Sequence, residues 1–372
     1  MSEFSGGADL KISAKPLRVI CACVLLGILV AGLWPFHSPK NEVTWVIHGN
    51  GLRFGKHGTV VSAGLFQADW LHRSGSCSVE IRLEPRRVQA MGTILAFYRH
   101  TDDIVPFIIR QSLGDLELRH TTEGHFAKRT RIYVNDVFGT SKSVFLTVSS
   151  GATGTSIYTD GVLVEKTSSF ILSDADLTGQ LILGNIPTTT DNWGGQVNSL
   201  AVYNRELSAR EVAEHFADWT AGTQAELAKT EGVTAIYLLN ENRGRVAHNQ
   251  ISSTTDLVIP ERFFILHEQF LERPWDEYRS DGAFWKDVAV NIVGFIPLGF
   301  FFSAYLSSIR NTKRVLELTI ALGFIVSLTI EVLQAFLPTR NSGMTDLITN
   351  TLGTGVGLVL CRCTSCSQLL RK

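Results

Sequence analysis

Three long apolar runs near the C-terminal end of the chain each carry carboxylate or amide side chains at helical spacing. The runs cover residues 288–306, 315–337 and 344–361. Residues three or four positions apart lie on one face of a helix, so each run presents its polar residues on a single face. The polar pairs are Asp287 with Asn291, Glu331 with Gln334, and Asp346 with Asn350.

Polar groups at such positions favour two roles, and the sequence leaves both open. Runs of this length can cross a hydrocarbon layer of about 30 Å, where carboxylates and amides are costly unless they face one another or a ligand. The first interpretation is a ligand-binding cluster. It would include Arg340, in the short loop after the second run, as a partner for a carboxylate or an anionic headgroup. In the second, the polar groups only join helices by hydrogen bonds, aided by close packing at Gly353 and Gly357.

A second and weaker set of candidate ligand residues lies in polar loops of the middle region. It consists of Asp102, Asp103, Asp191, Asn192 and Trp193. These residues could bind a sugar, but they are also typical of turns, and the tryptophan is equally suited to a core or its rim. Glycoside hydrolysis needs two carboxylates across the sugar, and no strand has the pattern E-x-D-x-E. We interpret Asp115 and Glu117, which alternate on one strand face, as a solvated edge. We therefore expect a binding protein rather than an enzyme and assign no catalytic residue.

The composition is that of a membrane protein. Only 19% of the 372 residues are charged, and the mean hydropathy is +0.13, whereas about a quarter of the residues of a typical soluble domain are charged. The net charge is -1 and the basic residues are spread along the chain. We therefore expect no nucleic-acid partner.

Residues 17–36 form a further apolar run, which brings the expected number of membrane spans to four. A cleaved signal peptide is the competing interpretation, but the run lacks a clear small-x-small cleavage site before Lys40. If the spans alternate, most flanking basic residues fall on one side, which the positive-inside rule makes cytoplasmic. These residues are Lys11, Lys15, Arg18, Arg310, Lys313, Arg314, Arg362, Arg371 and Lys372. Both termini are therefore expected in the cytoplasm, with residues from about 37 to 286 outside it.

The six cysteines do not form a disulfide framework. Cys77 is the only cysteine between the first and second spans. Cys361, Cys363 and Cys366 lie at the inner end of the last span, in a reducing compartment. Their spacing could bind a metal or accept a lipid, but no histidine is near, and a plain membrane-edge segment is the favoured interpretation.

From residue 45 onward the pattern changes to short alternating segments. Residues 78–83, 115–119 and 144–148 are typical of half-buried strands. Asp160 and Gly161 lie between two apolar segments, which is a strong hairpin signal. Two more expected strands, 235–240 and 256–260, could complete the fold. This many short strands predicts a β-sandwich with its own core, able to fold without a disulfide.

Three stretches of this region resemble the laminin-G/pentraxin type of concanavalin A-like domain. They are residues 51–55 (GLRFG), the hairpin 158–164, and residues 193–208 (WGGQVNSLAVYNRELS). The last stretch leads into an expected short helix with Ser208 as N-cap. The resemblance covers roughly residues 43–220 and implies a jelly-roll sandwich. Since this fold hosts sugar binders, hydrolases and protein-binding modules, it does not decide the function.

The C-terminal runs are similar to the VanZ-like family. The resemblance rests on residues 291–300 (NIVGFIPLGF), 327–340 (SLTIEVLQAFLPTR) and 346–357 (DLITNTLGTGVG). The family has about four spans, so residues 17–36 would be the first span here and the sandwich would be inserted after it. The family is named for a protein linked to glycopeptide resistance. The resemblance therefore implies a role in the cell envelope rather than a particular reaction.

Together these observations predict a multi-domain membrane protein, with an all-β concanavalin A-like jelly-roll sandwich inserted into a four-helix transmembrane VanZ-like bundle. The expected parts are a cytoplasmic N-terminus (1–16), a first transmembrane helix (17–36), an extracytoplasmic sandwich (40–260), an interfacial linker (261–286), three further helices (287–361) and a cytoplasmic tail (362–372). Aromatic residues before the second span, such as Trp275 and Trp285, suit a membrane interface.

The expected function is recognition of a cell-envelope glycan or glycolipid in the bacterial inner membrane. The sandwich would bind sugar and the helices would contact membrane lipids, in a role related to cell wall or exopolysaccharide and, through the family name, to antibiotic resistance. The alternative is a scaffold for a protein partner of the envelope polysaccharide machinery. No cofactor is assigned, and calcium in the sandwich is left open.

The topology is testable with a reporter that is active only in the cytoplasm. Fused after Lys372 or inserted near Asn311, the reporter is expected to be active. Inserted near Gly154, it is expected to be inactive, because that position lies in the outer segment. Reporter activity at all three positions would overturn the proposed outer location of the sandwich.

Overall fold

The computed structural model describes residues 14–47, 49–67, 75–122, 129–139, 142–188, 190–267, 270–278, 282–309, 314–340 and 342–369. The chain divides into two compact units. One is the β-rich segment Ser38–His267, and the other combines Met1–His37 with Glu268–Lys372 and is helical. Several of the flanking basic residues, namely Lys11, Arg310, Lys313, Arg371 and Lys372, lie outside the described residues.

The β-rich unit consists of two eight-stranded sheets, which confirms an all-β jelly-roll-like domain N-terminal to the helical region. The first sheet has the order β1 (Val43–Trp45), β2 (Leu52–Phe54), β13 (Gly195–Tyr203), β4 (Cys77–Pro85), β9 (Val144–Gly151), β10 (Gly154–Thr159) and β11 (Val162–Thr167), with β14 (Val233–Tyr237) also paired to β13. The second has the order β15 (Val246–Ala247), β16 (Leu257–Val258), β3 (Val60–Ser62), β12 (Gln180–Leu183), β5 (Met91–Arg99), β6 (Ile104–Ser112), β7 (Asp115–Thr121) and β8 (Arg129–Val134).

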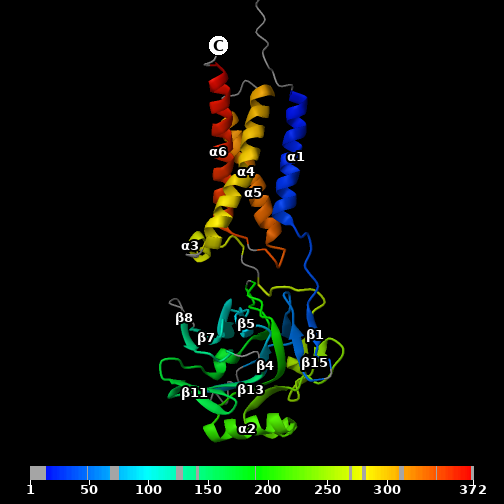
Figure 1. Cartoon of the computed structure of the whole chain (residues 1–372), viewed down its shortest axis with the longest axis vertical. Helices are drawn as coiled ribbons and strands as arrows, with labels where there is room; N and C mark the ends of the chain where they lie inside the picture. Colours follow the sequence, from blue (N-terminus) through cyan, green and yellow to red (C-terminus); the bar gives the residue numbers. More distant parts are fainter. Residues whose placement is uncertain are drawn as a thin grey trace, which may run out of the picture. The chain divides into compact units, whose positions relative to one another are not determined.

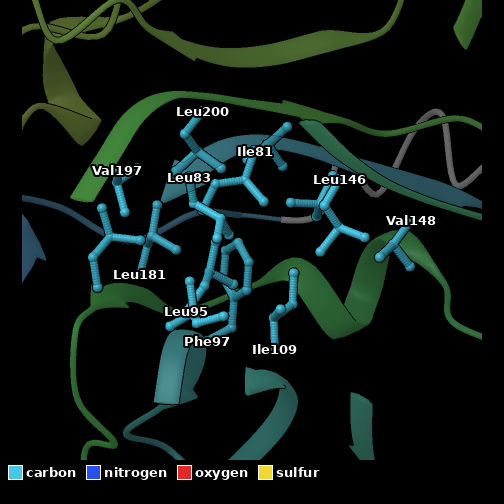
Figure 2. Packing of buried hydrophobic residues seen from close by; sticks show 14 of the residues in the cluster. Ile81, Leu83, Leu95, Phe97, Ile109, Leu146, Val148, Leu181, Val197 and Leu200 are labelled. Atoms are coloured by element: carbon cyan, nitrogen blue, oxygen red, sulfur yellow. The ribbon is translucent and has the colours of Figure 1, made fainter. Parts of the chain in front are cut away.

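The core lies between the two sheets because alternate residues of each strand point inward. In β4, Ile81 and Leu83 face Leu95 and Phe97 of β5, with Ile109 of β6 beside them (Figure 2). Alternation along the apolar segments predicts eleven core residues, and nine of them are in this cluster, namely Phe54, Ile81, Leu83, Ile157, Leu181, Leu183, Val197, Leu200 and Val202. Trp45 packs at its margin, and Phe145 belongs to a second cluster beneath α2.

Local sequence signals account for the hairpin and for helix α2 (Ala209–Ala221). Asp160 and Gly161 both have positive φ, 50° and 78°, as a tight two-residue β-turn requires, and they connect β10 to β11. Ser208 caps α2, because its side chain accepts a hydrogen bond from the backbone N–H of Glu211. The side chain of Glu211 in turn accepts a hydrogen bond from the backbone N–H of Ser208. The amphipathic helix then covers the outer face of the first sheet (Figure 1).

A buried carboxylate anchors α2 to this sheet. Glu80 of β4 is fully buried, and both of its oxygens lie 3.1 Å from Nδ1 of His215 on α2. The hydroxyl of Tyr203 donates to Glu80 at 2.9 Å, and its ring stacks on the imidazole. Burial alone lowers the pKa of His215, but the hydrogen bond and charge of Glu80 outweigh burial and raise that pKa.

The ends of the β-rich unit lie next to each other. Lys40 and Arg262 form an isolated antiparallel bridge, and the backbone N–H of Phe263 donates to the carbonyl of Pro39 at 3.0 Å. The guanidinium of Arg262 also donates to the carbonyl of Ser38 at 2.9 Å. Entry into and exit from this unit are therefore held together by backbone pairing.

The helical unit contains α1 (Ala14–Leu33), the short α3 (Pro274–Glu277), α4 (Gly282–Ile309), α5 (Val315–Gln334) and α6 (Met344–Leu369). Within the described residues, three helical segments are long and apolar enough to cross a membrane: Lys15–Leu33, Phe284–Ile309 and Val315–Gln334. Helix α6, where we expected a fourth span, is long enough but carries Asp346, Asn350 and several threonines and glycines. Helices α1, α4, α5 and α6 run side by side (Figure 1).

Small residues explain the close approach of α4 and α6. A Cβ atom at Gly353 would overlap the carbonyl oxygen of Ile292, and one at Gly357 would overlap that of Ile296. The expected close packing at these two glycines is therefore present. Apolar side chains of α1 complete the unit by packing against Phe295 of α4 and Ile330 of α5.

The His215–Glu80 pair predicts a pH-dependent stability of the sandwich. Folding raises the pKa of His215 above its unfolded value of about 6.5. The contribution of His215 to the free energy of unfolding is therefore complete below about pH 6.5, and it is lost as the pH rises through the pKa of the folded state. In a fragment of residues 38–267, His215→Gln should cost about 1.5–3 kcal/mol at pH 6, because hydrogen bonds between charged groups contribute that much. Urea unfolding at pH 6 and pH 8 measures both effects.

The matched control is His248→Gln, because His248 pairs with Asp256 at 3.0 Å but its side chain is 61% exposed. Solvent screens that pair, so its loss should change the free energy of unfolding by less than about 1 kcal/mol. The two variants behaving alike would show that His215 does not anchor α2.

Candidate functional site

The face of the second sheet that points away from the core carries a connected set of charged side chains. In β7, Leu116 points into the core. Because side chains alternate along a strand, Glu117 and Arg119 lie on the opposite face. Register pairs Glu117 with Arg110 of β6 on one side and with Tyr133 of β8 on the other. One row across three strands therefore holds an arginine, a glutamate and a tyrosine.

Glu117 is the centre of this set and is only 1% exposed. Its Oε1 accepts hydrogen bonds from Nε of Arg119 at 2.7 Å and from the hydroxyl of Tyr133 at 3.1 Å. Its Oε2 accepts from Nη2 of Arg119 at 3.0 Å and from Nη1 of Arg110 at 3.1 Å. Each oxygen thus has two donors, which compensates for the burial of the charge.

Arg110 connects Glu117 to the loop before β13. Its Nε and Nη2 donate to the two carboxylate oxygens of Asp191, at 2.8 and 3.0 Å. The hydroxyl of Thr93 also donates to Asp191 at 2.7 Å, and the backbone N–H of Asp191 donates to Asn185 at 2.9 Å. A loop that is far away in sequence is therefore fixed on the sheet by a bidentate ion pair.

Both carboxylates are held in their ionised form. Burial raises the pKa of Glu117, but hydrogen bonds and charge from Arg119, with Tyr133 and Arg110, outweigh burial and lower it. Burial likewise raises the pKa of Asp191, and Arg110 with Thr93 lowers it below its usual value. Two carboxylates therefore face three arginines on this face, counting Arg131 of β8, whose Nη1 lies 3.9 Å from Glu117.

The outer rim of the set is open to solvent. Tyr133 is 46% exposed, although its hydroxyl is fixed by Glu117. The side chains of Arg119 and Arg131 are 35% and 57% exposed. An exposed aromatic ring held in place beside fixed hydrogen-bonding groups can pack against the apolar face of a sugar while the polar groups bind its hydroxyls. We refer to Arg110, Glu117, Arg119, Arg131, Tyr133 and Asp191 as the sheet-face site.

The five loop residues expected from the sequence lie in two places rather than one. Asp191 belongs to the sheet-face site, and Asn192 follows it near the start of β5, where it bridges to Thr93. Asp102 and Asp103 are in the turn at the other end of β5, where Asp103 accepts a hydrogen bond from Tyr98 at 2.7 Å. Strand geometry separates these two places by roughly 25 Å.

Trp193 is fully buried rather than available to a ligand. Its indole Nε1 donates to Gln111 at 2.8 Å, and its ring packs against Phe54. Asp102 pairs with Arg99 at 3.1 Å, as is common for a turn residue. Asp102 and Trp193 therefore fit the alternative interpretation, in which these residues form a turn and part of the core.

The interpretation of Glu117 as part of a solvated edge is wrong, because Glu117 is nearly inaccessible to solvent. Alternation showed that Glu117 and Arg119 share a face with each other, but it could not show that neighbouring strands cover that face. Sequence analysis also missed Arg110 and Tyr133. The only sequence feature that could have indicated them is the two-residue alternation of β6 and β8. Arg110 lies two positions after Ile108, and Tyr133 lies two positions after Arg131.

The polar residues of the helices form two separate groups of contacts. In the first, the buried side chain of Glu331 on α5 accepts a hydrogen bond at 2.8 Å from the backbone N–H of Gly343, just before α6. Asn291 on α4 donates to Asp346 on α6 at 2.6 Å. The carboxylates of Glu277 and Asp287 are near enough to repel that of Asp346. One turn further along α6, Asn350 donates to Ser327 of α5 at 3.0 Å.

In the second group, Gln334 and Arg340 bind the C-terminal end of α1. Gln334 Nε2 donates to the carbonyl of Gly32 at 2.8 Å, and Arg340 donates through Nε and Nη2 to the carbonyl of Trp34. Within the part of the chain that the structure describes, no ion pair joins Arg340 to Glu331 or Asp346. Arg340 caps the end of helix α1, and its charge also acts on Asp346 from beyond ion-pair distance.

Among the described residues, no group of three or more His, Cys, Asp and Glu side chains is arranged to hold a metal ion. Cys361 and Cys363 are free thiols, and the side chain of Cys366 lies outside the described residues. The fold and contacts therefore define two candidate sites, the sheet-face site and the group around Glu331 and Asp346.

Two known families match successive parts of the chain, and the second match begins at β14, inside the β-rich unit. Residues 59–213 match the Laminin_G_3 model of the concanavalin A-like lectin/glucanases superfamily. Residues 233–366 match the VanZ/LLP1 family. The suspected architecture, a laminin-G-like domain combined with a VanZ-like region, is confirmed. With the three apolar helices, it indicates a membrane protein.

Solved structures with a similar fold are distant. The receptor-binding domain of botulinum neurotoxin D is 13% identical, with a TM-score of 0.37 over 49% of this chain and 47% of that chain. A Bacteroides ovatus protein to which carbohydrate binding is attributed is 12% identical, with a TM-score of 0.40 over 59% of this chain and 58% of that chain. The matched part spans about half the length of these structures. A search of curated proteins finds no match.

The bond from Gly343 to Glu331 predicts how substitutions at Glu331 affect stability. Glu331→Gln keeps an oxygen that can accept this bond and should unfold at nearly the same temperature as the unmodified chain. Glu331→Leu leaves a buried N–H without an acceptor and should cost about 1–3 kcal/mol. Thermal unfolding of the full chain in detergent measures the difference.

The matched controls are Glu317→Gln and Glu317→Leu, because Glu317 is an exposed carboxylate at the other end of the same helix. Neither control should lower the unfolding temperature. If Glu331→Leu were as stable as Glu317→Leu, the connection between α5 and the start of α6 would not depend on this hydrogen bond.

Proposed function

We propose that this chain is a multi-pass protein of the bacterial inner membrane whose concanavalin A-like domain binds an envelope glycan or glycolipid. In this proposal α1, α4, α5 and α6 all cross the membrane, both termini are cytoplasmic, and residues from about 37 to 286 are extracytoplasmic. The sandwich is inserted between the first and second spans. The pairing of Lys40 with Arg262 supports an insertion, because it returns the chain to where it entered the domain.

The observation that carries the proposed glycan binding is the exposed ring of Tyr133 on the sheet-face site. The ring is fixed because its hydroxyl donates to Glu117, which is itself held by Arg110 and Arg119. A rigid aromatic surface surrounded by charged hydrogen-bonding groups loses little conformational entropy when it binds a sugar. The match to the lectin/glucanases superfamily supports this proposal.

The helices would contribute a site for the lipid or headgroup part of the ligand. The residues we propose for it are Asp287, Asn291, Glu331, Asp346 and Asn350. The Oδ1 of Asn350 is buried and accepts no hydrogen bond from the described residues, so it has capacity for a donor. Gln334 and Arg340 would act indirectly, by holding α1 against the other helices. A role in glycopeptide resistance would follow if the bound glycolipid is a cell-wall precursor.

A second function, binding of a protein partner, is favoured by the edge strand β11. Val162, Leu163 and Val164 are consecutive and all exposed there, with 66%, 49% and 41% of their surfaces accessible. An apolar edge strand can pair with an extended segment of another protein by strand addition. A scaffold for envelope machinery would use this edge rather than the sheet-face site.

Glycan binding is tested by applying the detergent-solubilised full chain to an array of bacterial and plant oligosaccharides. We expect binding to at least one class of glycan, and Tyr133→Ala should weaken it about tenfold or more, because buried aromatic contacts dominate binding energies. The control is Tyr278→Ala, since Tyr278 is 56% exposed in the helical unit and is not part of the sheet-face site.

The two functions give different results in this experiment. If no glycan on the array is bound, the proposal fails in favour of the scaffold. If glycan binding is equally weakened by Tyr133→Ala and Tyr278→Ala, sugar recognition does not use the sheet face.

A further inference from the structure

We infer that the glycan recognised by the sheet-face site carries an anionic group, and that Arg119 and Arg131 bind this group. The inference rests on the proposed glycan binding and specifies its chemical class. It comes from an excess of positive charge at the exposed end of the site.

The two arginines lie directly opposite each other. The register of β7 and β8 pairs Arg119 with Arg131, so their side chains leave the same face of neighbouring strands. Like charges in directly opposed positions destabilise a sheet unless a counter-charge lies between them. Glu117 is the only carboxylate within ion-pair distance of either arginine among the residues that the structure describes.

The carboxylate of Glu117 cannot satisfy both arginines. It already accepts two hydrogen bonds from Arg119, one from Arg110 and one from Tyr133. Arg131 approaches it only to 3.9 Å, beyond hydrogen-bond distance. Arg131 also interacts with the hydroxyl of Tyr133. Because its side chain is 57% exposed, its remaining donors face solvent next to Arg119, where an anion can accept from both guanidinium groups.

Stability of the sandwich does not account for this arrangement. The contact of Arg131 with Glu117 is long, at 3.9 Å, and the arginine is 57% exposed, so the contact contributes little to folding, and the opposed arginine works against it. General attraction to anions does not account for it either, because the chain as a whole has a net charge of -1. The excess is local, and it lies beside the exposed ring of Tyr133.

Guanidinium groups suit carboxylate, sulfate and phosphate, since they present parallel N–H donors to two oxygens of the anion. Tyr133 would pack against the sugar ring, and Arg119 with Arg131 would bind its acidic substituent. The site would then prefer a uronic acid, a sulfated sugar or a sugar phosphate over a neutral sugar of the same size.

The test measures the affinity of the detergent-solubilised full chain for four probes by isothermal titration calorimetry. The probes are an oligogalacturonate for carboxylate, a κ-carrageenan oligosaccharide for sulfate, a mannose 6-phosphate oligosaccharide for phosphate, and a cello-oligosaccharide as the neutral probe. We expect at least one acidic probe to bind about tenfold more tightly than the neutral probe. That preference should shrink as salt is raised, because exposed charges are screened.

Arg131→Gln should weaken binding of the preferred acidic probe about tenfold, the loss expected for a charge-assisted hydrogen bond, and weaken any binding of the neutral probe by a clearly smaller factor. The control is Arg53→Gln, which removes one exposed arginine from β2 in the other sheet and should change neither affinity. Equal unfolding temperatures of the two variants would exclude a difference caused by misfolding.

The outcomes separate the inference from the proposed function. Binding of the neutral probe as tight as that of every acidic probe, or equal effects of Arg131→Gln and Arg53→Gln, would overturn the inference while glycan binding stands. Failure of all four probes and of the broader array to bind would remove both. The acidic probe that binds best identifies the anionic group as carboxylate, sulfate or phosphate.

Discussion

A carboxylate removed from water must find hydrogen-bond donors within the protein, and this constraint organises both units of the chain. Three glutamates, Glu80, Glu117 and Glu331, are 0%, 1% and 1% exposed. Each takes its donors from a different segment: Glu80 from α2, Glu117 from β6 and β8, and Glu331 from the start of α6. Because a buried carboxyl group without hydrogen-bond partners is costly, these contacts fix the segments relative to one another within each unit.

Sequence patterns predicted the elements well because alternation and caps are local. The inward faces of β4 and β12, the Asp160-Gly161 turn and the Ser208 cap all follow from residues a few positions apart. The division into a concanavalin A-like and a VanZ-like part was also recognisable, because both carry extended motifs. The number of spans is less well defined, since α6 combines spanning length with a polar surface.

The candidate site was harder to predict because it depends on pairing between distant segments. Arg110 and Asp191 are 81 residues apart and meet only when the loop before β13 folds onto the sheet. Alternation gives Glu117 a face but does not reveal that neighbouring side chains cover it. Helical spacing likewise grouped Gln334 with Glu331, and closeness in sequence added Arg340, whereas the hydrogen bonds of Gln334 and Arg340 go to the end of α1. Tertiary contacts, rather than residue type, decide which polar groups remain free to bind a ligand.

The same reasoning separates structural from ligand-binding roles at the sheet face. A side chain whose hydrogen-bonding capacity is used within the protein, such as Glu117, can orient a ligand site but has little capacity left for the ligand itself. Arg131 differs, because it lies opposite Arg119 and approaches Glu117 only to 3.9 Å. It interacts with the hydroxyl of Tyr133, and its other donors are exposed to solvent. An exposed residue that contributes little to folding yet completes a row of fixed polar and aromatic groups has the position expected of a ligand-binding residue. In the proposed function, the buried members of the sheet-face site would supply rigidity, and its exposed members, Tyr133 and Arg131, would contact the glycan.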